Sequence, residues 1–146
     1  MNPLARFLRL PAADRSLLIR SAFLLGVARV ALWVLPLRVA RRVVARLAPR
    51  APGAPPADRI GWAVTAARRV IPRATCLPQA LAGEALLVRN GHAAELILGV
   101  AKTPQGRLEA HAWVESRGRL VVGELRQGMA QYTPLPPLPP LSKTAA

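Results

Sequence analysis

The positions of the prolines limit where this chain can form helices and strands more than any other feature of its sequence. Fifteen of its 146 residues are proline, which ends a helix and disfavours helical backbone at the residue before it. Pro36 and Pro72 therefore each end a helical stretch, and residues 48–56 and 134–140 are too rich in proline for helix or sheet. The predicted divisions are a basic helical segment (1–50), a connector (51–57), a main domain (58–135) and a tail (136–146), either an extended strap or disordered.

The first predicted helices lie before the connector. Asp14 is a good N-cap for a long helix, which is apolar from Ser21 to Leu35 except for Arg29. That run is shorter than the roughly 20 residues that a bilayer requires, and a central arginine costs about 2.5–3.5 kcal/mol on insertion. We therefore favour a helix packed on protein. Residues 37–47 then predict an amphipathic basic helix. Its basic face is either exposed to solvent, with the apolar stripe turned toward the core, or a docking surface for an acidic partner or membrane.

The main domain begins with two further helices and continues with strands. Asp58 is expected to cap a helix from Arg59 to about Val70, and Thr75 one from Cys76 to about Arg89. The second of these is apolar on nearly every side and must be buried. After Asn90 and Gly91 the apolar period changes to two, which predicts strands at 94–101, 107–115 and 119–124. The fold class is therefore α+β.

Composition restricts the chemistry. A formal charge of +14 indicates a nucleic acid, a membrane surface or an acidic peptide as partner, although it also fits a biased source genome. The chain has only six Trp, Phe and Tyr residues that could stack on bases, which argues against binding of single-stranded nucleic acid. One cysteine excludes an internal disulfide, and two histidines make a zinc site improbable. We expect metal-free chemistry without a cofactor, and a cytoplasmic protein because no signal peptide is evident.

The single cysteine occupies a special position. Thr75 as N-cap and Pro78, which is tolerated only in a first helical turn, place Cys76 at the start of a helix. The partial positive charge of a helix N-terminus favours the thiolate, the form that attacks carbonyl groups. The alternative is a buried cysteine that acts as a small apolar side chain.

A histidine and an acid follow on the predicted strands. Alternation puts Leu108, Ala110, Ala112 and Val114 on one face of the second strand and His111 on the other. If Arg117 and Gly118 form a two-residue loop, Glu124 lies directly across from His111, with Cβ atoms about 4.5–5.5 Å apart. Arg-Gly is not a favoured loop, and a shift of one residue would send Glu124 to the other face.

Cys76, His111 and Glu124 thus supply a nucleophile, a base and a group that orients the base, in that order along the chain. This combination acts on acyl groups. The histidine would take the thiol proton and later protonate the leaving amine, and N–H groups in the first turn after Thr75 could stabilise the oxyanion.

The motifs that carry a family resemblance run from Asp58 to Leu135. They resemble the lasso-peptide biosynthesis B2 proteins, which are transglutaminase-like cysteine proteases that remove the leader of a ribosomal precursor peptide. The matching stretches are Asp58-Arg59-Ile60, Thr75-Cys76-Leu77-Pro78-Gln79-Ala80-Leu81, Leu96 to Val100 and Ala110-His111-Ala112-Trp113-Val114-Glu115. The resemblance implies a papain- or transglutaminase-like core, with the nucleophile helix packed on a small antiparallel sheet.

The resemblance also implies roles for single residues. Cys76 is the expected nucleophile and His111 the general base. The family's third residue is commonly an aspartate, and this chain has no aspartate after Asp58. Glu124 is the acid that matches best, and a non-acidic substitute such as Gln127 is the alternative. Candidates for substrate binding or the oxyanion are Leu77, Gln79 and Trp113, although for Gln79 a structural hydrogen bond is favoured.

The implied partners are the precursor peptide, a small leader-recognition protein and an ATP-using cyclase that receives the core peptide. The basic helices would dock the recognition protein or an acidic leader. Two other classes of function stay open: a non-catalytic adaptor or chaperone that binds the precursor through a protease-like fold, and a basic binder of membranes or nucleic acid. Neither explains why the Cys76 and His111 motifs occur together.

Overall fold

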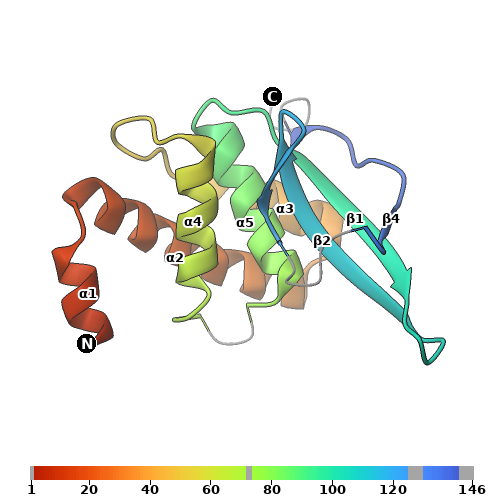
Figure 1. Ribbon diagram of the computed structural model, residues 1–146. Helices are drawn as coiled ribbons and strands as arrows, with labels where there is room; N and C mark the ends of the chain where they lie inside the picture. The colour runs from red at the N-terminus through yellow and green to blue at the C-terminus, as the bar shows by residue number, and fades with distance from the viewer. Residues whose placement is uncertain (1, 72–73, 125–129, 142–146) are drawn as a thin grey trace.

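The computed structural model of the protein describes residues 2–71, 74–124 and 130–141. Helices come first along the chain and strands follow, so the predicted α+β class is confirmed (Figure 1). The helices are α1 (Pro3–Arg9), α2 (Ala12–Val34), α3 (Leu37–Leu47), α4 (Ala57–Ala67) and α5 (Cys76–Arg89). The strands are β1 (Glu95–Lys102), β2 (Leu108–Ser116), β3 (Arg119–Val122) and β4 (Thr133–Pro134).

The helix ends agree with the sequence only in part, because α4 ends at Ala67 rather than at about Val70, and Pro72, which is expected to end it, lies outside the described residues. Pro36 separates α2 from α3, and α5 has the predicted bounds. The helix starts differ, because Pro11 and Pro56 occupy the N-cap positions expected for Asp14 and Asp58, and α1 was not predicted. Both aspartates lie instead in the first turn of their helices, and Asp14 accepts two hydrogen bonds from Arg59. The hydrogen bond from Arg59 lowers the pKa of Asp14, so this pair ties the start of α2 to α4.

Helix α5 lies at the centre of the molecule. It contacts α2, α3 and α4 on one side and strands β1, β2 and β3 on the other (Figure 1). Every residue from Pro78 to Leu87 is buried, as expected for a helix that is apolar all round. One continuous core joins α5 to Leu24 of α2, Val44 of α3 and Val114 of β2. The N-terminal helices therefore share a core with the residues after the connector.

The sheet is antiparallel, with strand order β3-β2-β1-β4. The short β4 contradicts the expectation that residues 134–140 are too rich in proline for sheet, because Pro134 is tolerated on an edge strand. Arg117 and Gly118 form the two-residue loop between β2 and β3, and both have positive φ, as the twist of a tight hairpin requires. Ala112 and Val114 are buried in the core as predicted, whereas Leu108 and Ala110, near the start of β2, are exposed, so only half of the predicted face is covered. The opposite face of the sheet carries a smaller cluster of Ala101, Trp113 and Tyr132.

A buried ion pair connects α3, α5 and the C-terminal segment. Arg41 donates to both carboxylate oxygens of Glu84 at 2.8 and 2.5 Å, and its third contact is a 2.6 Å hydrogen bond to the carbonyl of Pro139. Burial raises the pKa of Glu84, and the hydrogen bonds from Arg41 oppose that shift. The described part of the Pro-rich tail is thus an extended strap, held by Arg41 and by the buried Leu141.

Removal of one partner of the ion pair should cost more unfolding free energy than removal of both, because the remaining partner is left buried and charged. Glu84→Gln leaves the Arg41 charge buried without a counter-charge and should cost about 3–5 kcal/mol of unfolding free energy. The double variant Arg41→Met, Glu84→Leu removes both charges and should lose much less, as measured by urea unfolding. Equal losses in the single and double variants would contradict this account.

Candidate active site

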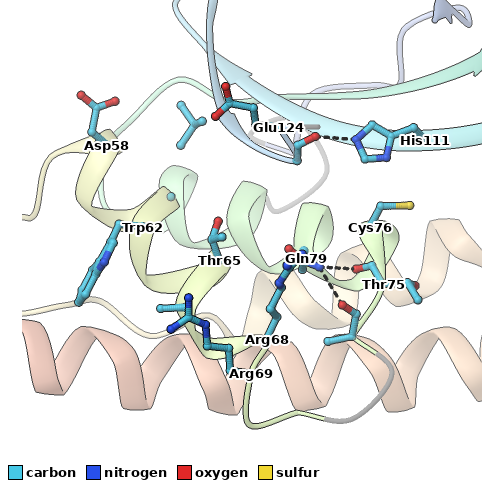
Figure 2. A pocket seen from close by; sticks show the side chains of 15 residues that line it. Asp58, Trp62, Thr65, Arg68, Arg69, Thr75, Cys76, Gln79, His111 and Glu124 are labelled. Atoms are coloured by element: carbon cyan, nitrogen blue, oxygen red, sulfur yellow. Dashed lines mark hydrogen bonds between the residues drawn. The ribbon is translucent and has the colours of Figure 1, made fainter. Parts of the chain in front are cut away.

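A cleft of about 880 Å³ opens between α4, the start of α5 and strands β2 and β3. Cys76, Gln79, His111 and Glu124 all line it, so the fold brings together residues that lie up to 48 positions apart in the sequence. Figure 2 shows Cys76 and His111 next to each other at one end of this cleft, with the α4 side chains along its wall. The predicted nucleophile and base therefore share one solvent-accessible cavity.

Cys76 is the first residue of α5 and is partly buried. Thr75 occupies the N-cap position as predicted, but its side chain makes no capping hydrogen bond. Gln79 holds this turn instead, because its Nε2 donates to the carbonyl oxygens of Ala74 at 2.7 Å and Thr75 at 3.1 Å. The amide nitrogen of Gln79 is thus used in a structural role, which leaves the first-turn N–H groups as the candidate oxyanion donors.

His111 is buried and fixed in one orientation by the protein backbone. Its Nε2 lies 2.6 Å from the carbonyl oxygen of Gly123. A carbonyl oxygen can only accept, so Nε2 carries the proton and Nδ1 keeps its lone pair. In Figure 2 the second ring nitrogen lies on the side of Cys76. The imidazole is therefore in the tautomer that can take a proton from the thiol.

Aromatic rings hold the imidazole from the side. The Trp113 ring stacks on it at a centroid distance of 5.9 Å and an interplanar angle of 23°, and the Tyr132 ring is tilted at 5.4 Å. Trp113 also donates from its indole nitrogen to Glu115 at 3.2 Å. These contacts limit rotation of His111 away from Gly123.

The predicted pairing of Glu124 with His111 is wrong, because β3 contains a bulge. Ser116 pairs with Arg119 and Glu115 with Leu120, as the two-residue loop requires, but Val114 pairs with Val122. Val121 is the extra residue, so everything after it is displaced by one position. Glu124 consequently lies past the end of β3, exposed at the cleft, and Figure 2 shows its carboxylate pointing away from His111.

Gly123 can bring its carbonyl to His111 because it lacks a side chain. Its φ is +102°, which L-residues rarely adopt. A Cβ at this position would lie 2.8 Å from the carbonyl oxygen of Ala112 and 2.8 Å from the Cβ of Trp113. The chain after β3 can therefore approach β2 this closely only with glycine there.

The other predicted candidates do not line the cleft. Leu77 is packed against the main core, and Trp113 supports the cleft from behind, where it stacks on the His111 ring and packs close to Gly123. Gln127, the alternative third residue, lies outside the described residues. Within the described ranges, no group of three or more His, Cys, Asp or Glu side chains is placed to hold a metal ion.

The sequence reasoning missed the wall that α4 contributes to the cleft. Residues at helical spacing on one face of this segment line the cavity: Asp58, Trp62, Thr65 and Arg69, together with Arg68. The guanidinium of Arg59 lies over the Trp62 ring, 3.9 Å from its centroid. The spacing of four, three and four residues is a signal that could have identified this face from the sequence.

The arrangement defines a class of protein: an α+β fold in which a cysteine begins a buried helix and meets a histidine from an antiparallel sheet. Residues 21–136 match the model of the transglutaminase-like superfamily, so the chain belongs to that superfamily, which includes cysteine peptidases. Comparisons with curated proteins and with solved structures gave no match.

The close approach at Gly123 gives a test of the site's geometry by stability alone. Gly123→Ala should destabilise the protein through both its positive φ, at about 1–2 kcal/mol, and overpacking against β2, at about 1–3 kcal/mol more. Gly106→Ala is the matched control, because Gly106 has φ +83° with open space around it. Thermal or urea unfolding should show the larger loss for Gly123→Ala; equal losses would mean that the approach to β2 is not tight.

Proposed function

We propose that this protein is a cysteine peptidase that removes the leader from a ribosomally made lasso-peptide precursor. The observation that carries the proposal is that Cys76 and a His111 imidazole, held in the proton-accepting tautomer by Gly123, face the same open cleft. Membership of the transglutaminase-like superfamily supports the cysteine chemistry. The resemblance of the Cys76 and His111 motifs to lasso-peptide B2 proteins supports the particular substrate.

The shape of the cleft favours a peptide over a small molecule. Residues from both ends of α4 line it, and this 11-residue helix is about 16 Å long at 1.5 Å per residue. An extended peptide rises about 3.3 Å per residue, so about five substrate residues fit along the wall. Acidic side chains (Asp58, Glu124) and basic side chains (Arg68, Arg69) provide polar contacts for such a strand.

The proposed reaction has two stages. Nδ1 of His111 takes the thiol proton, and the Cys76 sulfur attacks the last carbonyl of the leader, with first-turn N–H groups near the developing oxyanion. The imidazolium then protonates the leaving amine, which releases the core peptide with a free N-terminus and leaves the leader as a thioester. Water, deprotonated by the same imidazole, hydrolyses the thioester and frees the leader with a carboxylate end.

The proposal includes the partners of the reaction. A small recognition protein would present the leader, and an ATP-using cyclase would take the core peptide with its new amino group. A cytoplasmic location fits a ribosomal precursor and an ATP-using partner. No step requires a metal or a cofactor.

Substitution of the nucleophile tests the proposal directly. With precursor and recognition protein present, Cys76→Ala and His111→Ala should reduce leader removal, followed by mass spectrometry, by at least 1,000-fold, because each removes a group that takes part in bond making. His92→Ala is the matched control, since the Nε2 of His92 also lies 2.8 Å from a backbone carbonyl but outside the cleft. A cleaving Cys76→Ala variant, or a wild-type protein that binds the precursor without cutting it, would favour the adaptor function instead.

Glu124, the acid beside the site, should prove dispensable for catalysis. Because Glu124 points away from His111, Glu124→Gln should change kcat by less than about threefold, and Asp58→Asn, the other acid in the cleft, serves as its control. A loss of 100-fold or more in Glu124→Gln alone, by the same assay, would return the orienting role to this carboxylate.

A further inference from the structure

One face of α2 is apolar and has no covering element among the described residues. Its most exposed members are Ile19, Phe23, Val30, Trp33 and Val34, with exposed fractions of 54–86%. At 100° per residue these five lie within about 60° of a common line, over four turns of the helix. Single exposed apolar residues are ordinary, but an aligned row of this length marks an interaction surface.

Positive charge surrounds this apolar row. Arg20 and Arg29 lie on opposite flanks of the row, and Arg15 lies at its N-terminal end. Arg15, Arg20 and Phe23 also line a shallow hollow next to the row. Between Asp14 and Asp58 the chain has eight arginines and no acidic residue. The surface therefore complements a partner that is both apolar and negatively charged.

The buried opposite face of α2 limits how such a partner can bind. Among the described helices, α2 is long and apolar enough to cross a membrane by length and composition, but Leu17, Leu24, Leu25 and Ala28 on its other face are buried against the domain. A helix packed on α4 and α5 cannot be surrounded by lipid on all sides. It can lie along an interface, with one face on protein and the other outward.

We propose that this face of α2 docks the protein on an anionic lipid surface. A row that combines Phe and Trp with flanking arginines is typical of helices that lie in the membrane interface, where the apolar side chains enter the acyl boundary and arginines reach the headgroup phosphates. The row lies on a convex helix surface, which a bilayer accepts without a matching groove. A folded protein partner would need a complementary groove and acidic side chains.

The experiment is flotation of the whole protein with vesicles of phosphatidylcholine and phosphatidylglycerol at 3:1, compared with vesicles of phosphatidylcholine alone. The wild-type protein should float with the anionic vesicles and at least tenfold less with the neutral ones. Binding should weaken but persist at 0.5 M salt, because salt screens the arginines and leaves the apolar contact. Absence of binding to both kinds of vesicle would overturn the proposal.

Two double variants distinguish binding through this face from nonspecific binding to vesicles. Phe23→Gln with Trp33→Gln, and Arg20→Gln with Arg29→Gln, should each lower vesicle binding at least tenfold. The matched controls are Val70→Gln with Leu108→Gln, which removes apolar side chains that are 69% and 76% exposed elsewhere, and Lys102→Gln with Arg107→Gln at the β1–β2 turn. Circular dichroism checks that all variants are folded. Equal losses in test and control pairs would overturn the proposal.

The fluorescence of Trp33 reports whether this side chain enters the lipid, independently of the fraction of protein that is bound. Its fluorescence should shift to the blue on anionic vesicles, and Trp33→Phe should remove the shift while retaining binding, because phenylalanine keeps the apolar contact. Self-association that these variants abolish in gel filtration, without any vesicle binding, would show instead that a second copy covers the face. Binding of an acidic leader peptide through this face, without any vesicle binding, would likewise overturn docking on lipid.

Discussion

Burial of α5 on every side is the constraint on which the rest of the structure depends. A helix with no polar face must be covered by both the helices and the sheet, so its two ends are the parts that can reach solvent. Gly83 allows β3 to approach, because a Cβ there would lie 2.7 Å from a side-chain methyl of Val122. The start of α5, where Cys76 lies, is therefore held on a rigid element and still opens into the cleft.

The site is assembled from segments that are distant in the sequence. Cys76 comes from α5, His111 from β2, and the wall from α4, while Tyr132 reaches the imidazole from the chain just before β4. The position of His111 thus depends on the C-terminal segment as well as on its own strand. The strap bound by Arg41 continues that segment, so the tail contributes to the same scaffold.

The sequence predicts the helices well because proline and apolar period act locally. Pro36, the bounds of α5 and the loop at Arg117 and Gly118 could all be read in this way. The bulge at Val121 could not, because it depends on how β3 meets its neighbours: a Cβ on Gly61 of α4 would lie 2.4 Å from the Val121 carbonyl oxygen. One inserted residue was enough to move Glu124 away from His111. The exposed face of α2 was also beyond sequence reasoning, since composition does not say which side of an apolar helix is covered.

The acceptor that orients His111 belongs to the main chain, and this changes how the site can be recognised and altered. No side-chain substitution deletes a carbonyl oxygen, so an alanine scan of the cleft side chains that the structure describes would find a nucleophile and a base and no side chain that orients the base. A search for a conserved acid would miss it as well. Evolution must preserve the positive φ at Gly123. A glycine, and not a carboxylate, therefore identifies the group that orients the histidine.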